Sequence, residues 1–405
     1  MVRIGVIADD LTGANDAGLQ FAKAGLETMV AVAGGDIISD VVVVNTQSRA
    51  LPADEASRRA ADAARRLDAV LLYKKMDSTA RGPWGAELAA IMEITGRRLA
   101  LVTPAFPAQG RTVVHGRVWV AGVPLEQSEF AGDPAFLLHT GDLAALLAAQ
   151  GAGPVWHAGL ELIERGPAAL ADYVRQVGAG VIICDAERGE HLQSIAGAAA
   201  VLRPAPLLCG SAGLAAAVPA AFGWPARAQR QAIRGAPVLI VAGSRHPATV
   251  RQCIAAEAAG AARFNLDPIA LTDRPASPGQ CRQAAAALAG GRDVILCLDP
   301  RAPAAAEKAE AIANGLAATA LRVISDAGRP GALALSGGDV AYAFCRQADV
   351  WAMRLLDEIL PGIPAGRLLG GLLDNMPAAT KAGGFGASDA WVRVAQYFRG
   401  NSGEL

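Results

Sequence analysis

The sequence predicts an α/β protein with two three-layer domains, each built on a mostly parallel sheet. Short β-branched runs alternate with Ala-rich helical stretches along the chain. The 405 residues exceed the size at which a single hydrophobic core usually stops growing. Near residues 222–237 the alternation of apolar strands and helices is interrupted by a segment rich in Pro, Gly, Arg and Gln. We therefore place the two domains at residues 1–230 and 231–405.

Apolar, β-branched runs mark the expected strands of the first domain. They occupy residues 2–8, 40–45, 69–77, 99–104, 180–185 and 206–210. A helix follows the first strand, because small and apolar residues recur on one helical face and Gly25 supplies a stop. That face consists of Ala14, Ala17, Gly18, Phe21 and Ala22. Pro104 and Pro107 then fix a loop that leads into an expected hairpin.

The second domain repeats the same alternation of strands and helices. Its expected strands lie in residues 237–244, 293–299 and 331–339. The last helix is expected at residues 387–398, and the polar tail RGNSGEL after it is expected to fray. The domain boundary near residue 230 thus separates two α/β patterns.

Composition excludes several classes of function. The formal net charge is -1 and 19% of the residues are charged, which disfavours nucleic acid as a partner. The apolar runs end well before the roughly 20 residues of a membrane span. The N-terminus shows no secretory signal pattern, so we expect a cytoplasmic protein without a membrane partner.

Cysteine and histidine patterns do not support a disulfide framework or a metal centre. The six cysteines are scattered without a C-x-x-C pair, which favours free buried thiols. The histidines are dispersed and no H-E-x-x-H occurs. The segment CGSAG lacks the G-x-S-x-G spacing of a nucleophile elbow, so we expect Ser211 to cap a helix.

Two adjacent carboxylates end the first expected strand, in the segment IADDLTGANDAG at residues 7–18. Asp9 and Asp10 should project from the carboxyl end of the sheet, where open α/β sheets bind ligands. One aspartate can cap the next helix and the other can bond locally in the turn. Two neighbouring carboxylates exceed what one cap needs, which favours a binding site.

A second polar cluster, YKKMDSTARG at residues 73–82, also follows a strand. Arg81 is suited to grip a carboxylate, Lys75 adds a point charge, and Asp77 accepts hydrogen bonds from hydroxyls. Together they suit an anionic, hydroxylated small molecule. The alternative is a solvated loop in which Ser78 or Asp77 caps a helix.

A third segment, TPAFPAQGRTVVHGRVWVAG at residues 103–122, contributes a candidate anion ligand. Arg111 follows the turn at Gly110. His115 fits equally well as an exposed strand residue.

Three Gly-rich turns in the second domain suggest phosphate binding. They are VAGSRHPATVRQ, LSGGDVAYAF and TKAGGFG, and each joins or follows a sheet element. Glycine lets backbone N–H groups approach phosphate oxygens, and a helix N-terminus favours negative charge. A single Gly-rich turn of this kind is common in proteins that bind no phosphate, whereas three in one domain favour a phosphate-binding site. Neither G-x-x-x-x-G-K-[ST] nor G-x-G-x-x-G after a strand is present.

Taken together, these segments resemble the four-carbon acid sugar kinases. IADDLTGANDAG, KKMDSTARG, PAFPAQGRT, GSRHPATVRQ, SGGDVA and TKAGGFG occur in that family's order, from residue 4 to about residue 390. The resemblance implies an N-terminal domain that binds a sugar acid, a C-terminal domain that binds ATP, and reaction in the interdomain cleft. Members phosphorylate the terminal hydroxyl of D-threonate, D-erythronate or 3-oxo-tetronates.

The resemblance also implies roles for individual residues. The sugar-acid ligands it indicates are Asp9, Asp10, Lys75, Asp77, Ser78, Arg81, Gly82 and Arg111. The ATP-binding residues it indicates are Ser244, Ser336, Gly337, Gly338, Asp339, Lys381, Gly383 and Gly384. Mg2+ is expected through the phosphates of ATP. Arg81 and Lys75 are predicted to fix the substrate carboxylate, and Asp10 or Asp77 to accept the proton of the hydroxyl.

Some features leave the function open. The segment after the first Thr-Gly favours the D-threonate and D-erythronate branch over the 3-oxo-tetronate branch. Val113, His115 and the pair Arg245-His246 depart from the usual family pattern. A non-catalytic sugar-acid-binding regulator and a Rossmann-type oxidoreductase are the alternatives. The oligomeric state is left open, with a homodimer as the possible assembly.

Overall fold

The chain forms two α/β units, which are described separately. The computed structural model describes residues 2–32, 37–128, 130–131, 140–224, 233–303 and 308–400. The first unit comprises Met1–Thr28 and Ile37–Ala228, and the second comprises Met29–Asp36 and Gln229–Leu405. The predicted boundary near residue 230 and the end of the polar tail lie outside the described residues.

A parallel sheet forms the centre of the first unit. Its strands run in the order β3-β1-β4-β11-β5-β10-β9, and each neighbouring pair is parallel. Their bounds are β1 Val2–Ala8, β3 Val41–Asn45, β4 Ala69–Lys75, β5 Leu99–Thr103, β9 Val155–Ala158, β10 Gly180–Cys184 and β11 Leu207–Gly210. All the strands predicted for the first domain are therefore present.

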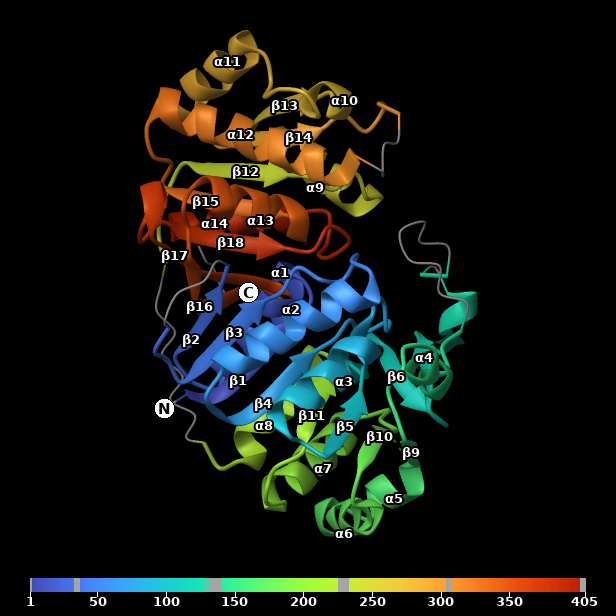
Figure 1. Ribbon diagram of the computed structural model, residues 1–405. Helices are drawn as coiled ribbons and strands as arrows, with labels where there is room; N and C mark the ends of the chain where they lie inside the picture. Colours follow the sequence, from blue (N-terminus) through green and yellow to red (C-terminus); the bar gives the residue numbers. More distant parts are fainter. Residues whose placement is uncertain are drawn as a thin grey trace. The chain divides into compact units, whose positions relative to one another are not determined.

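Helices cover both faces of this sheet (Figure 1). Their bounds are α1 Leu11–Lys23, α2 Ala53–Arg66, α3 Trp84–Thr95, α4 Leu143–Ala149, α5 Leu160–Glu164, α6 Pro167–Val177, α7 Gly189–Val201 and α8 Ala212–Ala221. Helix α2 packs beside α3, whereas α1, α8, α7 and α6 pack in succession. The predicted helix after the first strand is α1, and Gly25 follows its end with a φ of 82°.

The hairpin predicted after Pro107 is also present. It consists of β6 Arg111–Val114 and β7 Arg117–Val120, and β8 Val123–Pro124 completes a separate three-stranded sheet. Short 3-10 helices lie at Pro107–Gln109 and Leu125–Gln127. His115 lies in the tight turn of this hairpin, with a φ of 51°, rather than in a strand.

The sheet of the second unit is mixed. Strands β13, β14, β12, β15 and β18 are parallel in that order, and β17 and β16 extend the sheet in antiparallel fashion. The bounds are β12 Val238–Ala242, β13 Ala262–Leu266, β14 Val294–Leu298, β15 Ala332–Ser336, β16 Ala352–Leu360, β17 Ile363–Leu369 and β18 Pro377–Lys381. Strand β2, Thr28–Ala31, lies where the chain passes from the first unit to the second.

Helices of the second unit pack around this mixed sheet. They are α9 Pro247–Ala258, α10 Pro268–Leu271, α11 Pro278–Ala289, α12 Ala309–Ala327, α13 Gly338–Gln347 and α14 Ala390–Arg399, with a 3-10 turn at Gly371–Leu373. Helices α9 and α14 pack together, and α12 packs beside α10, α11 and α13. Trp391 and Phe398 of α14 lie in an apolar core with β12, β15 and β18. No helix in the described ranges is both long and apolar enough to span a bilayer.

Candidate functional site

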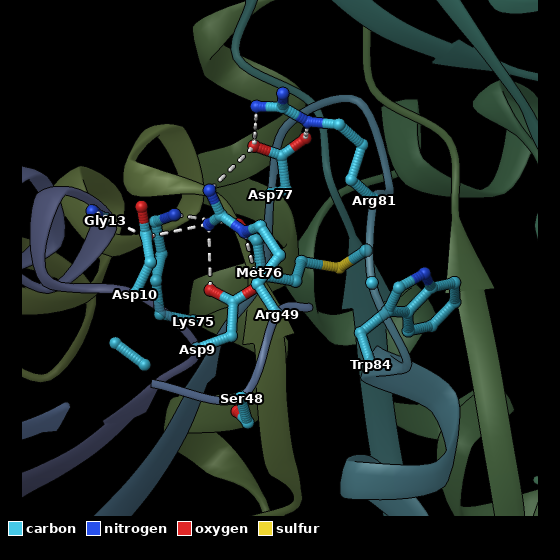
Figure 2. Close-up of polar contacts among 12 residues, drawn as sticks. Asp9, Asp10, Gly13, Ser48, Arg49, Lys75, Met76, Asp77, Arg81 and Trp84 are labelled. Carbon is cyan, nitrogen blue, oxygen red and sulfur yellow. Dashed lines mark hydrogen bonds and ion pairs between the residues drawn. The ribbon is translucent and has the colours of Figure 1, made fainter. Parts of the chain in front are cut away.

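The two polar segments predicted for the first domain meet at one edge of the sheet. Strand β1 lies between β3 and β4, and Ala8 pairs in register with both Asn45 and Lys75. The residues that follow these three strands therefore leave the sheet at the same edge, where parallel α/β sheets bind ligands. Figure 2 shows Asp9, Asp10 and the 75–81 segment gathered there.

Arg49 joins the three aspartates of this edge, and sequence analysis missed it. Its Nε and Nη2 donate to the two oxygens of Asp9, each at 2.9 Å. Nη2 also donates to Asp10 Oδ1 at 2.7 Å, and Nη1 lies 3.8 Å from Asp77 Oδ1. The guanidinium thus lies between all three carboxylates (Figure 2). The sequence pattern that could have pointed to Arg49 is its position shortly after the strand that ends at Asn45.

Asp9 is a buried carboxylate whose oxygens are both occupied. Burial raises its pKa, but the charges of Arg49, Lys74 and Lys75, with the Arg49 hydrogen bonds, lower it to about 2. Asp9 is therefore ionised at neutral pH. Its bidentate pairing gives it the role of holding Arg49 in place.

Asp10 caps helix α1 and remains partly exposed. Its Oδ1 accepts from the Gly13 N–H at 2.9 Å, so the predicted helix cap at this turn is confirmed. The side chain is 18% exposed, and within the described ranges its other oxygen accepts no hydrogen bond. A Cβ at Gly13 would lie 2.5 Å from Asp10 Oδ1 and 2.9 Å from Lys75 Nζ. Glycine therefore leaves the room that both groups need.

Lys75 is a buried ammonium group beside Gly13. The residue is 4% exposed, and its Nζ donates to the carbonyl of Met76 at 2.8 Å. An ammonium group has three N–H donors. The described part of the chain supplies no second hydrogen-bond acceptor to this nitrogen. Lys75 is therefore equipped to bind an anion or a hydroxyl oxygen.

Asp77 and Arg81 close the 73–82 segment into a tight turn. Asp77 Oδ2 accepts from Arg81 Nε at 2.9 Å and from the N–H and hydroxyl of Thr79, while Oδ1 accepts from Arg81 Nη2 at 3.0 Å. Burial raises the pKa of Asp77, but Arg49 and Arg81 hold it well below the usual value. The carboxylate is a structural acceptor of this turn, and helix α3 begins only at Trp84.

Two other predicted residues lie in or near the same turn. Ser78 is half-buried in it. Gly82 has a φ of 85°, and a Cβ there would lie 3.0 Å from the carbonyl oxygen of Arg49. Gly82 is therefore required for the close approach of the Arg49 backbone.

Arg111 lies in the separate β6–β7 hairpin rather than at the end of a strand of the main sheet. Its Nη1 donates to the carbonyl of Gln109, and its guanidinium carbon lies 5.4 Å from the centre of the Phe130 ring. The hairpin turn is held by Asp185, which accepts from the backbone N–H of His115 at 2.8 Å and of Gly116 at 2.9 Å.

The predicted phosphate-binding turns of the second unit also meet at one sheet edge. Strand β15 lies between β12 and β18, with Ser336 in register with Ala242 and Lys381. The carboxyl ends of these strands bring together the predicted residues of this region, which are Ser244, Ser336, Gly337, Gly338, Asp339, Lys381, Gly383 and Gly384.

Several polar groups at this edge suit phosphate oxygens. Helix α13 begins after Gly337, whose φ is 97°, and in the described part of the chain it has no side-chain cap hydrogen bond at its N-terminus. The buried hydroxyl of Ser336 has no hydrogen-bond partner in the described part of the chain. A Cβ at Gly383 would collide with Ser244, which shows how closely those two turns pack. A helix N-terminus with uncapped N–H groups favours an anion.

Lys381 holds the last Gly-rich turn together. Its ammonium donates to the carbonyls of Ala382, Gly383 and Phe385 at 2.7, 3.1 and 3.1 Å. The residue is 1% exposed, and its Nζ lies 5.3 Å from the centre of the Trp391 ring. Burial lowers the pKa of Lys381 to about 8. The three N–H donors are thus directed at the turn itself.

Residues that sequence analysis did not single out support the same turn. Thr249 Oγ1 donates to the carbonyl of Gly383 at 2.6 Å. Gln252 Nε2 donates to the carbonyls of Phe385, Gly386 and Ala387 at 2.8 to 3.0 Å. Both side chains project from α9, whose first turn is capped by His246.

The predictions for the cysteines and for Ser211 are confirmed. All six cysteines are free and buried. Ser211 caps α8 by accepting from the Gly213 N–H at 3.0 Å. No group of three or more histidine, cysteine or acidic side chains suited to hold a metal ion occurs among the described residues.

Two family models match the chain. A sugar-binding N-terminal domain matches residues 4–218, and a nucleotide-binding C-terminal domain matches residues 239–391. These matches cover the first-unit edge with Asp9 and the second-unit edge with the Gly-rich turns. Their descriptions name sugar binding for the first match and nucleotide binding for the second.

Named relatives match over nearly the whole chain. A D-threonate kinase from Salmonella typhimurium is 38% identical, with 97% of each chain covered. A D-erythronate kinase from Heliobacterium modesticaldum is 32% identical, covering 98% of this chain and 97% of its own. A solved Haemophilus influenzae protein has a TM-score of 0.75 at 22% identity, covering 97% of this chain and 100% of its own, and shows the fold alone. The chain therefore belongs to the four-carbon acid sugar kinase family and is an ATP-dependent kinase of four-carbon sugar acids.

Proposed function

We propose that this kinase phosphorylates the terminal hydroxyl of D-threonate, with ATP and Mg2+ as co-substrate and metal. The observation that carries the assignment of the acid site is that Lys75 and Asp10 both lie beside Gly13. One is a buried ammonium with a single described acceptor, and the other is a carboxylate with an oxygen that accepts no bond in the described ranges. An acid with hydroxyl groups matches both partners.

The site geometry favours different roles for the acidic residues. Asp10 accepts the proton of the terminal hydroxyl, because its second oxygen is available. Asp77 is a poorer base, since both oxygens accept from Arg81 and its pKa is held low. Lys75 binds the substrate carboxylate, and Arg81, which is 24% exposed, adds positive charge nearby. Arg49 keeps Asp10 oriented.

In the second unit, backbone N–H groups of Gly338 and Asp339 and of the turn at Gly383–Gly384 bind the ATP phosphates, with the Ser336 and Ser244 hydroxyls. Gly337 contributes the backbone conformation at this turn, because its own N–H donates to the Lys381 carbonyl at 3.0 Å. The uncapped N-terminus of α13 supports this role. The described residues offer no preformed acidic cage, which suits Mg2+ carried by the phosphates. That ion neutralises charge on the transferring phosphoryl group.

The choice of D-threonate follows the similarity of the relatives. The D-threonate kinase is 38% identical and the D-erythronate kinase 32% identical. The substrate in each name is that of the relative, so the preference of this chain has to be measured.

A substrate screen tests this proposal. ADP release would be measured with D-threonate, L-threonate, D-erythronate, L-erythronate and 3-oxo-tetronate. We expect the highest kcat/KM with D-threonate, and no ADP release when EDTA removes Mg2+. Phosphorylation at the terminal carbon would give a 31P signal split by two protons. A higher kcat/KM with D-erythronate or 3-oxo-tetronate would reject D-threonate as the substrate.

A further inference from the structure

A second buried ion pair lies behind the aspartates of the acid site. Lys74 Nζ of β4 is 2.8 Å from Glu87 Oε2 of α3, and both side chains are fully buried. Neither was among the predicted site residues. Burial lowers the pKa of Lys74, but Glu87 and Asp9 raise it above its ordinary value, so the ammonium stays charged.

This ion pair is hydrogen-bonded to the backbone segments that carry Arg49 and Lys75, the two cations of the acid site. Glu87 Oε1 accepts a hydrogen bond from the hydroxyl of Ser48, the residue before Arg49. Lys74 Nζ donates to the carbonyl of Lys75 at 2.9 Å. The pair therefore connects the end of β3 with the end of β4.

Ser48 is the link between the ion pair and the aspartates. Its N–H donates to the Asp9 carbonyl at 2.8 Å, and the Arg49 N–H reaches the same oxygen at 3.2 Å. Its hydroxyl also lies 2.6 Å from Thr46 Oγ1, which donates to the carbonyl of Ala8 at 2.9 Å. The segment before Arg49 is thus hydrogen-bonded to Glu87 of α3 and to the backbone at Ala8 and Asp9.

Stability alone does not account for a charged pair at this position. Removing two charges from water costs several kcal/mol per ion, and well-packed apolar residues often stabilise a core as well or better. What a directed ion pair adds is a fixed geometry for the groups bonded to it. The groups bonded here are those next to Arg49 and Lys75.

We propose that Glu87 and Lys74 are positioning residues, which fix Ser48 and through it hold Arg49 in register with Asp9 and Asp10. The inference rests on the proposed function, because it assumes that Asp10 and Arg49 serve the sugar-acid half-reaction. Neither Glu87 nor Lys74 touches substrate. Their effect should therefore appear in turnover of the acid and not in ATP binding.

The first test replaces Ser48→Ala, which removes the bond to Glu87 and keeps both charges. We expect kcat/KM for D-threonate to fall about 10- to 100-fold, mostly in kcat, with an unchanged KM for ATP. Thr319→Val is the matched control, because it removes another buried hydroxyl, on α12, outside both sites. The control should lose stability similarly and keep normal kinetics. Normal kinetics in Ser48→Ala, or an equal loss for both substrates, would overturn the inference.

A double-mutant cycle tests whether Ser48 acts through Arg49. Arg49→Met alone should lower kcat/KM for the acid strongly. Adding Ser48→Ala to that variant should lower it no further, because the residue being positioned is gone. Two effects that multiply independently would contradict positioning and leave only a structural role for Ser48.

A matched pair of ion-pair variants separates charge from geometry. Lys74→Met with Glu87→Gln removes both charges but keeps an oxygen that accepts from Ser48. Lys74→Met with Glu87→Met removes that acceptor as well. We expect kcat/KM to fall in both variants, because both lack Lys74, and to fall further in the Met variant, because only the Gln variant still holds Ser48. The additional loss in the Met variant should be about the factor that Ser48→Ala loses. Equal activity of the two variants would overturn the inference, and if either fails to fold, the Ser48 cycle decides.

Failure of this inference is distinguishable from failure of the proposed function. Absence of turnover of D-threonate by the wild-type protein counts against the proposed substrate, and the cycle is then run with the acid that the screen identifies. Normal turnover in Ser48→Ala, with an active wild type, counts only against the positioning role.

Discussion

Asp9 and Asp10 are adjacent in sequence yet occupy different environments. The backbone at Asp10 is extended, with a φ of -146° and a ψ of 160°, so successive side chains leave it in opposite directions. Asp9 turns inward and pairs bidentately with Arg49, whereas Asp10 caps α1 and stays partly exposed. The pair therefore supplies one fixed structural carboxylate and one carboxylate with an available oxygen.

Asp10→Asn tests the proposed base. Asparagine still caps α1, because its side-chain oxygen can accept from the Gly13 N–H. We expect kcat to fall about 10²- to 10⁴-fold, while the KM for ATP and the melting temperature stay close to wild type. Steady-state kinetics measure kcat and the KM for ATP, and thermal unfolding measures the melting temperature. Near-normal turnover would remove Asp10 from the role of base.

Asp10→Ala provides the matched comparison for the cap. It removes the base and the cap together, so it should lose about 1 kcal/mol of stability in addition to the kinetic defect. Equal stability of the Ala and Asn variants would show that the cap contributes little.

At the scale of elements, the nucleotide edge consists of turns that other side chains hold in shape. Thr249 and Gln252 of α9 and the ammonium of Lys381 all donate to carbonyls between Ala382 and Ala387. The Phe385 N–H donates to the Ala382 carbonyl at 3.1 Å, so the backbone N–H groups that we assign to a ligand are those of Gly383 and Gly384. Lys381 was predicted from sequence to bind ATP, and its observed contacts support an indirect contribution through this turn.

The pKa of Lys381 predicts a pH dependence of ATP binding. Burial lowers this pKa to about 8, so the group is a three-donor ammonium at pH 7 and a two-donor amine at pH 9. One of the three carbonyl bonds is lost as the pH rises through 8, and the turn loosens. We expect the KM for ATP to rise between pH 7 and pH 9.

Lys381→Met is the control for that pH dependence. This variant should show a raised KM for ATP already at pH 7, with little further change up to pH 9. A wild-type KM that stays constant over the same range would contradict the role of the ammonium.

At the scale of the whole molecule, the local apolar pattern of the sequence predicted most of the parallel strands but missed β9 and β13. The runs at residues 2–8, 69–77 and 331–339 became β1, β4 and β15. The antiparallel pair β16–β17 was missed. Its strands contain charged residues such as Arg354 and Arg367, which pair across the two strands, so no continuous apolar run marks them.

Hydrogen exchange on the full chain tests the division between acid and nucleotide binding. A ligand that binds the native state protects the segments it contacts. We expect D-threonate to slow exchange at residues 9–13, 46–49 and 75–82, and a non-hydrolysable ATP analogue to slow it at residues 243–248, 336–340 and 381–386. Protection of the first set by the nucleotide alone would contradict the assignment of the two sites.

The sequence by itself determined which polar segments end strands, because strand and turn patterns are local. The resemblance to the kinase family then implied that Asp9, Asp10, Lys75, Asp77 and Arg81 serve one site. Only the tertiary structure showed that Arg49 joins the aspartates and that Glu87 accepts a hydrogen bond from Ser48, since these residues lie 39 to 40 positions from their partners. Their meeting depends on the strand order β3-β1-β4, which no local pattern encodes.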